Sequence, residues 1–210
     1  MTNPSPDITL YHAPRSRSVR VRWCLEEMGL PYRLERPAFN HGDVGGEAFR
    51  AINPLQKVPA MTDHGVLILE SNAMVDYLTS VYGPTSLRAT PDEPDYARYL
   101  EWLHYGEASL SMCVNLFLGH SALLPEAQRN PGIAKWSKTE IDKHLNHIAE
   151  RGLDGREWLA CDRFTAADLS VGYMLFLLKI MKALSDAPDA VQAYWSRIAE
   201  RPAWRTASAD

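Results

Sequence analysis

The feature that most constrains the fold of this chain is a change of pattern close to residue 94. Strand and helix signals alternate before this point, whereas the periodic segments after it all have the apolar spacing of helices. Between the two parts lie Gly83-Pro84, Pro91 and Pro94, and such residues interrupt regular structure. The pattern therefore predicts two domains, residues 1–82 and 95–210, joined by a linker at residues 83–94.

The first part is expected to form a strand, a helix that ends before Gly29, and a second strand parallel to the first, because a helix crosses between them. A short helix, a two-stranded hairpin and a last helix capped by Ser71 follow. The strands are expected at residues 8–12, 32–36, 59–62 and 66–69, and the later helices at 48–52 and 71–82. This order, with Pro59 at the start of the third strand, resembles the thioredoxin-like fold. The predicted fold class is an α/β thioredoxin-like domain followed by an all-α domain.

The second part is expected to contain four or more helices, at about residues 95–118, 134–151, 166–184 and 187–200. The third of these has a complete start signal, since Thr165 can cap the backbone amide of Asp168 and the Asp168 carboxylate can reach back to Thr165. Phe164 and Leu169 can pack together across the same turn. We expect this cap to be structural and to nucleate the core of the helical domain.

Composition argues against several classes of function. The formal net charge is −4, whereas nucleic-acid binding needs a basic surface that neutralises phosphates. No apolar run approaches the roughly 20 residues that span a bilayer, and residues 1–7 lack the apolar core of a secretory signal. Cys24, Cys113 and Cys161 form neither a CxxC pair nor a zinc-ligand pattern. We therefore expect a cytoplasmic protein with reduced cysteines and without nucleic-acid, membrane or metal partners.

Four separated segments together resemble the cytosolic glutathione transferase family, in particular its bacterial, serine-type members. They are Leu10–Ser18 (LYHAPRSRS), Asn53–Ala60 (NPLQKVPA), Leu69–Ala73 (LESNA) and Phe164–Asp168 (FTAAD). A fifth, Trp102–Ser109 (WLHYGEAS), is similar to the matching segment of a bacterial and fungal branch. The resemblance implies glutathione as co-substrate, a small-molecule electrophile as second substrate, and a homodimer.

The same resemblance assigns the two charged ends of glutathione to separate motifs. Glu70 and Ser71 match the pair that holds the γ-glutamyl carboxylate at a helix N-terminus, where unpaired amides favour anions. Val58 and a cis Pro59 match the segment that pairs with the cysteinyl backbone. Gln56 or Lys57 is expected to bind the glycyl carboxylate, and the sequence leaves open which of them does so. His41 is a further candidate, although a surface-loop histidine is the simpler interpretation.

The glutathione sulfur must be presented as a thiolate, because an unperturbed thiol is mostly protonated at neutral pH and the anion is the nucleophile. Ser16 follows the first strand, where serine-type relatives carry the hydroxyl that donates to the thiolate. Ser18 is an alternative donor, with Ser16 then acting as a helix cap, and Tyr11 lies near the place where the tyrosine-type branch keeps its phenol. Cys24 lies on the apolar face of the first helix, so no cysteine is placed for thiol exchange.

The electrophile site is expected to include the long first helix of the second domain. Trp102, Tyr105, Ser109 and Met112 recur on adjoining faces of that helix and are candidate contacts. The alternative is that these residues belong to the core, as aromatic residues and methionines at helical spacing commonly do. The predicted function is conjugation of the glutathione thiolate to an electrophilic, aromatic or xenobiotic compound in detoxification. Isomerisation, ether cleavage, dehalogenation, peroxide reduction and a non-catalytic binding module are the alternatives.

Overall fold

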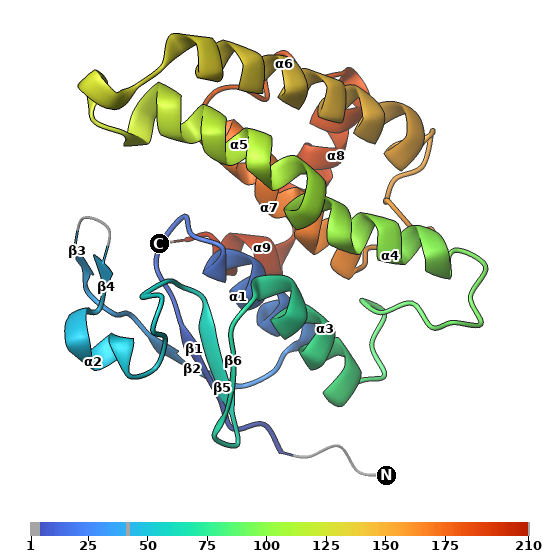
Figure 1. Ribbon diagram of the computed structural model, residues 1–210. Coiled ribbons are helices and arrows are strands. Elements are labelled where there is room, and N and C mark those ends of the chain that lie inside the picture. The colour runs from blue at the N-terminus through green and yellow to red at the C-terminus, as the bar shows by residue number, and fades with distance from the viewer. Residues whose placement is uncertain (1–4, 41–42, 210) are drawn as a thin grey trace. The chain divides into compact units, whose positions relative to one another are not determined.

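A computed structural model describes residues 5–40 and 43–209 of the chain (Figure 1). The chain divides into two compact units. The first contains residues 1–88 and 200–210, and the second contains residues 89–199. The division falls within the stretch that was expected to link two domains. The terminal segment, which the sequence assigned to the helical domain, belongs instead to the first unit.

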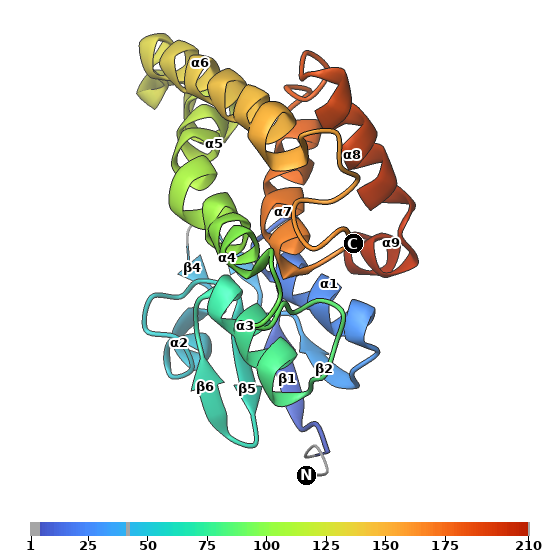
Figure 2. The same cartoon turned by 90° about the vertical axis from the view of Figure 1, so that its right-hand side faces the viewer.

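The first unit is built on a four-stranded mixed sheet with strand order β2-β1-β5-β6. The strands are β1 (Ile8–Tyr11), β2 (Tyr32–Glu35), β5 (Ala60–Asp63) and β6 (Val66–Ile68). Strand β2 runs parallel to β1, while β5 and β6 are each antiparallel to their neighbour. The helices are α1 (Ser18–Met28), α2 (Gly46–Arg50) and α3 (Ser71–Val81). Helices α1 and α3 pack together (Figures 1 and 2), so the expected thioredoxin-like arrangement is confirmed.

Two features of the first unit differ from the expectation. A short antiparallel pair, β3 (Phe39–Asn40) with β4 (Asp43–Val44), lies between β2 and α2, where the sequence predicted no strand. Helix α3 begins at Ser71 without a side-chain cap, so Ser71 is its first helical residue rather than its capping residue.

Glycine is required just before α2, because Gly45 has φ +70° and a Cβ there would lie 2.3 Å from the Phe49 Cβ.

The last helix of the chain, α9 (Pro202–Ala207), packs against α1. Trp204 meets Trp23 edge to face with ring centroids 4.8 Å apart, which is a favoured aromatic geometry. Arg201 donates to both carboxylate oxygens of Glu27, at 2.6 and 2.7 Å. These contacts explain why the terminal segment belongs to the first unit.

The second unit is entirely helical, as predicted. Its longer helices are α4 (Tyr96–Tyr105), α5 (Ser111–Leu118), α6 (Pro131–His147), α7 (Ala166–Ile180) and α8 (Asp189–Glu200). The helix expected over residues 95–118 is interrupted by a wider π-helical turn at Gly106–Leu110 (η1). A Cβ on Gly106 would lie 2.4 Å from the Ser170 carbonyl oxygen, so glycine allows α7 to approach at this turn. Further turns lie at Gly119–Leu123 (η2), Glu126–Gln128 (η3) and Ile148–Leu153 (η4).

Within residues 5–40 and 43–209, no helix combines the length and the apolar character needed to cross a membrane. All three cysteines are free thiols.

The start of α7 carries the predicted capping interaction. The buried Asp168 carboxylate accepts hydrogen bonds from the backbone N–H of Thr165 at 2.8 Å and of Leu159 at 3.1 Å. It also accepts from the Tyr194 hydroxyl at 2.8 Å. Burial raises the pKa of Asp168 to about 6, and the donors around it oppose that shift by favouring the charged form. One carboxylate therefore joins the start of α7 to a preceding loop and to α8.

Replacing this carboxylate should be costly. We expect Asp168→Ala to lower the free energy of unfolding by about 3 kcal/mol or more, because several buried donors lose their acceptor at once. The exposed Asp189, in the first turn of α8, is the matched control, and Asp189→Ala should cost less than about 1 kcal/mol. Urea unfolding measures both values, and equal losses would show that the carboxylate is only a surface cap.

Candidate functional site

Three loops of the first unit meet at one edge of its sheet. Tyr11, the last residue of β1, pairs with Ala60, the first residue of β5. Tyr11 also pairs with Glu35 at the end of β2, and Ile68 at the end of β6 pairs with Met61. The β1–α1 loop, the segment before β5 and the β6–α3 junction therefore leave the sheet at the same edge. The sequence motifs of residues 10–18, 53–60 and 69–73 lie there together.

Each of these three loops contains a non-glycine residue in the left-handed region. Arg15 has φ +59°, Gln56 has φ +49° and Glu70 has φ +42°. Residues other than glycine rarely have a positive φ. Those that do are often found at binding and catalytic sites. Positive φ also occurs at His64, in the β5–β6 turn, so it accompanies the motifs at this edge without being specific to it.

The β1–α1 loop gathers the two candidate serines around a buried histidine. The Ser16 Oγ lies 2.6 Å from the Ser18 Oγ, which lies 2.7 Å from the His12 Nδ1. Ser18 and His12 are fully enclosed, while Ser16 is partly exposed. The Ser18 Oγ also accepts from the Ala13 N–H at 3.1 Å. His12 lies within the motif of residues 10–18, but nothing in the sequence indicated that it would contact Ser18.

Tyr11, the third candidate for the thiolate contact, packs toward α2. Its ring lies 5.4 Å from that of Phe49, beside the buried cluster of Val44, Phe49 and Ala60. It also lines a pocket of about 220 Å³ that includes Glu35 and Arg36. The structure thus brings Ser16 and Ser18 together and directs the Tyr11 ring to a different set of neighbours.

The N-terminus of α3 is joined to a buried arginine. Arg20, from α1, has no exposed surface and donates from Nη1 to the Ser71 Oγ at 2.6 Å. Glu70, just before the helix, is exposed. A helix N-terminus favours anions, and the guanidinium adds positive charge beside it. The sequence motifs do not single out Arg20, since an arginine in the first turn of a helix is expected to be solvated, although its spacing of four residues from the buried Cys24 places it on the inner face of α1.

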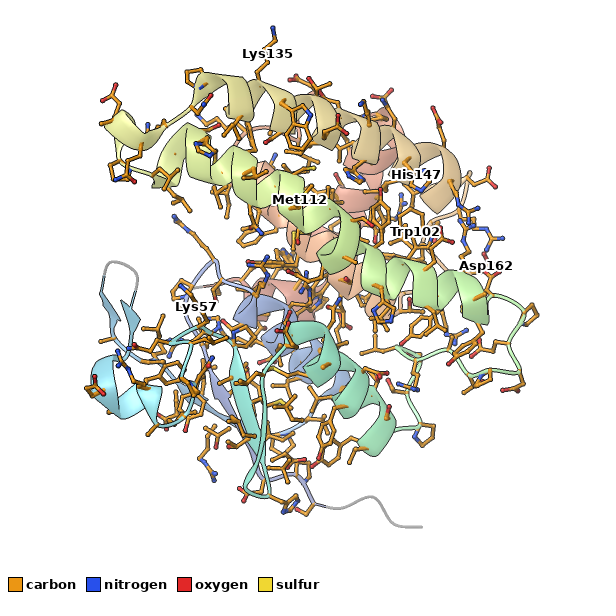
Figure 3. All side chains as sticks on the ribbon, viewed as in Figure 1. Lys57, Trp102, Met112, Lys135, His147 and Asp162 are labelled. Carbon is orange, nitrogen blue, oxygen red and sulfur yellow. The ribbon has the colours of Figure 1, made fainter. Side chains whose placement is uncertain are left out.

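The segment before β5 contains the expected cis bond, between Val58 and Pro59. Gln56 was a candidate to bind the glycyl carboxylate. Both polar atoms of its side-chain amide are already hydrogen-bonded to other residues of the first unit. Its Oε1 accepts from Arg50, with Nη2 at 2.8 Å, and its Nε2 donates to the Gly46 carbonyl at 3.1 Å. Lys57 is exposed at the surface (Figure 3). His41 lies outside the described residues.

Cys24 is excluded as a nucleophile by its surroundings. Its side chain has no exposed surface, and burial raises its thiol pKa far above the usual range. The expectation that this cysteine is structural agrees with the geometry.

In the second unit, two of the four candidate electrophile contacts are engaged in side-chain packing. Trp102 is fully buried, with its ring 4.6 Å from that of Tyr105 and 5.6 Å from that of His147 (Figure 3). The Tyr105 hydroxyl is hydrogen-bonded to the His144 Nδ1 on α6. Desolvation raises the pKa of Tyr105 to about 12 and lowers that of His144. Trp102 therefore belongs to the core, as the alternative interpretation held.

The other two candidates are more accessible. Ser109 lies in the π-helical turn and is partly exposed, and Met112 is 55% exposed on α5 (Figure 3). The π turn shifts the phase of the helix after Tyr105, so a uniform helical spacing could not show which candidates share a face.

Two family models match the chain. "Glutathione S-transferase, N-terminal domain" matches residues 6–80, and "Glutathione S-transferase, C-terminal domain" matches residues 126–206. Together they cover most of the sequence and fall on the two parts that the pattern distinguished.

Individual relatives agree with these models. Glutathione S-transferase 3 of Schizosaccharomyces pombe is 30% identical, with 96% of this chain and 86% of the relative covered. The disulfide-bond oxidoreductase YfcG of Escherichia coli is 26% identical, with 93% of this chain and 92% of the relative covered. A crystal structure of a theta class glutathione S-transferase from Xanthomonas axonopodis pv. citri, with glutathione bound, is 28% identical with a TM-score of 0.79. It covers 98% of each chain.

Proposed function

The chain belongs to the glutathione S-transferase family, and from this premise we propose that it binds glutathione, ionises its thiol and transfers it to an electrophilic small molecule. The observation that carries the proposal is the position of Ser16. Its partly exposed hydroxyl stands in the β1–α1 loop, at the sheet edge where α3 also begins. Glutathione bound in a relative of similar sequence supports the choice of co-substrate.

In this proposal the thiol proton leaves to solvent and the thiolate lone pair forms the new carbon–sulfur bond. In a substitution, the leaving group departs with the electron pair of the bond that breaks. In an addition, the displaced π pair moves to the neighbouring atom, which then takes a proton from water. The protein must stabilise the thiolate before these steps, and a hydroxyl donor combined with a helix N-terminus does so.

Ser16 is favoured over Ser18 by accessibility, and over Tyr11, which is also partly exposed, by the packing of the Tyr11 ring toward α2. The Ser18 hydroxyl is enclosed and already lies between the Ala13 N–H and the His12 Nδ1. Tyr11 packs against Phe49. We therefore assign donation to the sulfur to Ser16 and treat Ser18 as its support.

The two carboxylates of glutathione are assigned to the other loops of the same sheet edge. We place the γ-glutamyl carboxylate at the N-terminus of α3, beside Ser71 and the positive charge of Arg20, and the ammonium of the same group beside Glu70. We place the cysteinyl backbone along Val58, which precedes the first paired residue of β5. Since the Gln56 amide is already hydrogen-bonded, Lys57 is the better partner for the glycyl carboxylate.

The second substrate is proposed to be an electrophilic aromatic or xenobiotic compound, which makes detoxification the corresponding biological role. Ser109 and Met112 are the accessible candidates for contacting it. Disulfide reduction, the activity in the name of one relative, would be expected to use glutathione thiols, because desolvation raises the thiol pKa of Cys24, Cys113 and Cys161 alike. We also propose a cytoplasmic location.

A direct test of the γ-glutamyl assignment uses immobilised glutathione. The wild type should bind the resin and elute with free glutathione. Ser71→Ala should lose retention because the γ-glutamyl carboxylate loses a donor, and Glu70→Ala should lose it because the γ-glutamyl ammonium loses its acidic partner. Ser80→Ala, an exposed serine at the other end of α3, is the matched control and should bind like the wild type. Calorimetry checks any weak retention, and unchanged binding by both site variants would show that the assignment is wrong.

The assignment of the sulfur donor is tested by the pH dependence of conjugation with a panel of chromogenic electrophiles. Removing the Ser16 hydroxyl should return the bound thiol toward its usual pKa of about 8.5. A hydrogen bond to a charged group contributes roughly 1.5 to 3 kcal/mol. We therefore expect Ser16→Ala to lower turnover at neutral pH by about 10- to 150-fold, with partial recovery at alkaline pH.

Three results would contradict the proposed function. They are no turnover of any electrophile by the wild type, turnover of a small disulfide alone, and an unchanged pH profile in Ser16→Ala. Glutathione affinity should change little in this variant, since the hydroxyl contacts only the sulfur. A loss of thermal stability with an unchanged profile would make Ser16 a cap.

We further propose that the protein is a two-fold symmetric homodimer, as family members usually are and as is common for soluble oligomers. Light scattering at micromolar concentration should give twice the mass of one chain. The mass of a single chain under these conditions would refute the dimer without affecting the assignment of the sulfur donor.

A further inference from the structure

The buried His12 is connected to Ser16 by a continuous line of polar atoms. His12 Nδ1 lies 2.7 Å from the Ser18 Oγ, and the Ser18 Oγ lies 2.6 Å from the Ser16 Oγ. Ser16 in turn lies 2.8 Å from the carbonyl oxygen of Ala13. All three distances are those of made hydrogen bonds, so each contact needs one hydrogen between its two atoms.

Counting hydrogens fixes the direction of this line. The Ala13 carbonyl can only accept, so the contact of 2.8 Å uses the one hydroxyl hydrogen of Ser16. The contact between the two serines must then use the hydrogen of Ser18. No hydroxyl hydrogen is left for the contact with His12, and the imidazole must supply it from Nδ1. The longer contact between Ser18 and the Ala13 carbonyl, at 3.2 Å, needs no hydrogen of its own.

The opposite tautomer leaves one contact without a hydrogen. If Nδ1 accepted from Ser18, the Ser16 hydrogen could go either to Ser18 or to the Ala13 carbonyl. In the first case, two oxygen atoms would face each other at 2.8 Å without a hydrogen between them, and in the second case at 2.6 Å. Donation from His12 also fits the two lone pairs of the Ser18 Oγ. One accepts from the Ala13 N–H and the other from the His12 Nδ1, while the Ser18 hydrogen is donated to Ser16.

We propose that His12 is a positioning residue for the glutathione sulfur: it donates from Nδ1 to Ser18, Ser18 donates to Ser16, and the Ser16 hydrogen is therefore not used in the contact with Ser18 and can turn to the sulfur. This inference rests on the proposed function, which assigns Ser16 as the sulfur donor. When the thiolate binds, the Ser16 hydrogen turns from the Ala13 carbonyl to the sulfur, and the donors behind it remain in place. Successive donors polarise one another, so the chain strengthens the last hydrogen bond. His12 never touches the substrate.

The test compares His12→Leu with His12→Asn, two side chains of similar shape, only one of which can donate to Ser18. The pKa of the bound glutathione thiol is followed by the ultraviolet absorbance of the thiolate. His12→Leu should raise this pKa and lower kcat/KM at neutral pH by about 2- to 10-fold, the size of one neutral hydrogen bond. His12→Asn should keep most of the lowered thiol pKa, because its amide can replace Nδ1 as the donor.

A double-mutant cycle with Ser18→Ala separates this role from a merely structural one. Ser18→Ala interrupts the same line, so it should raise the thiol pKa by about as much as His12→Leu. Adding His12→Leu to Ser18→Ala should then change the pKa little further. If His12→Leu fails to fold, the other two variants still test the proposal. His12→Asn should shift the thiol pKa only slightly, and Ser18→Ala should shift it more.

The outcomes are distinguishable from a failure of the proposed function. If Ser16→Ala leaves the thiol pKa unchanged, the assignment of the sulfur donor is wrong and this inference is overturned with it. If Ser16→Ala raises the pKa while His12→Leu and Ser18→Ala do not, only the role of His12 is overturned. Equal shifts in His12→Leu and His12→Asn, or full additivity with Ser18→Ala, would also overturn it.

Discussion

The pairing of Tyr11 with Ala60 is the constraint on which the site depends. Because β1 and β5 are antiparallel, this register brings the loop after one strand beside the segment before the other. Ile8 and Leu10 are buried, so a slip of one residue would turn these side chains out of the core. The burial of apolar side chains therefore fixes the positions of Ser16, Val58 and the start of α3.

Two separate groups of hydrogen-bond donors are proposed to bind glutathione and to ionise its thiol. At the start of α3, helix amides and the buried Arg20 provide positive charge where a carboxylate is expected. At the start of α1, neutral hydroxyls form a directed line that begins at His12. The first arrangement favours binding of a charged tripeptide, and the second lowers the pKa of its thiol. Binding and ionisation can therefore be separated by mutation.

The sequence allowed correct predictions where the controlling interaction is local. Gly29 ends α1 in a left-handed conformation, and Thr165 and Asp168 mark the start of α7. Interactions between distant segments were not predictable in this way. The burial of Arg20, the use of the Gln56 amide by Arg50 and the packing of Trp204 on Trp23 all depend on partners that only the folded chain supplies. The π turn at Gly106 likewise depends on the approach of α7.

A crystal structure of the protein with glutathione is the most direct test of the central claim, which is that Ser16 donates to the thiolate. The sulfur should lie within hydrogen-bonding distance of the Ser16 Oγ, with the γ-glutamyl carboxylate at the N-terminus of α3. The Ser16 hydroxyl should have turned from the Ala13 carbonyl while its contact with Ser18 remains. A sulfur bonded to the Tyr11 phenol or the Ser18 hydroxyl, with Ser16 still on the Ala13 carbonyl, would contradict the account.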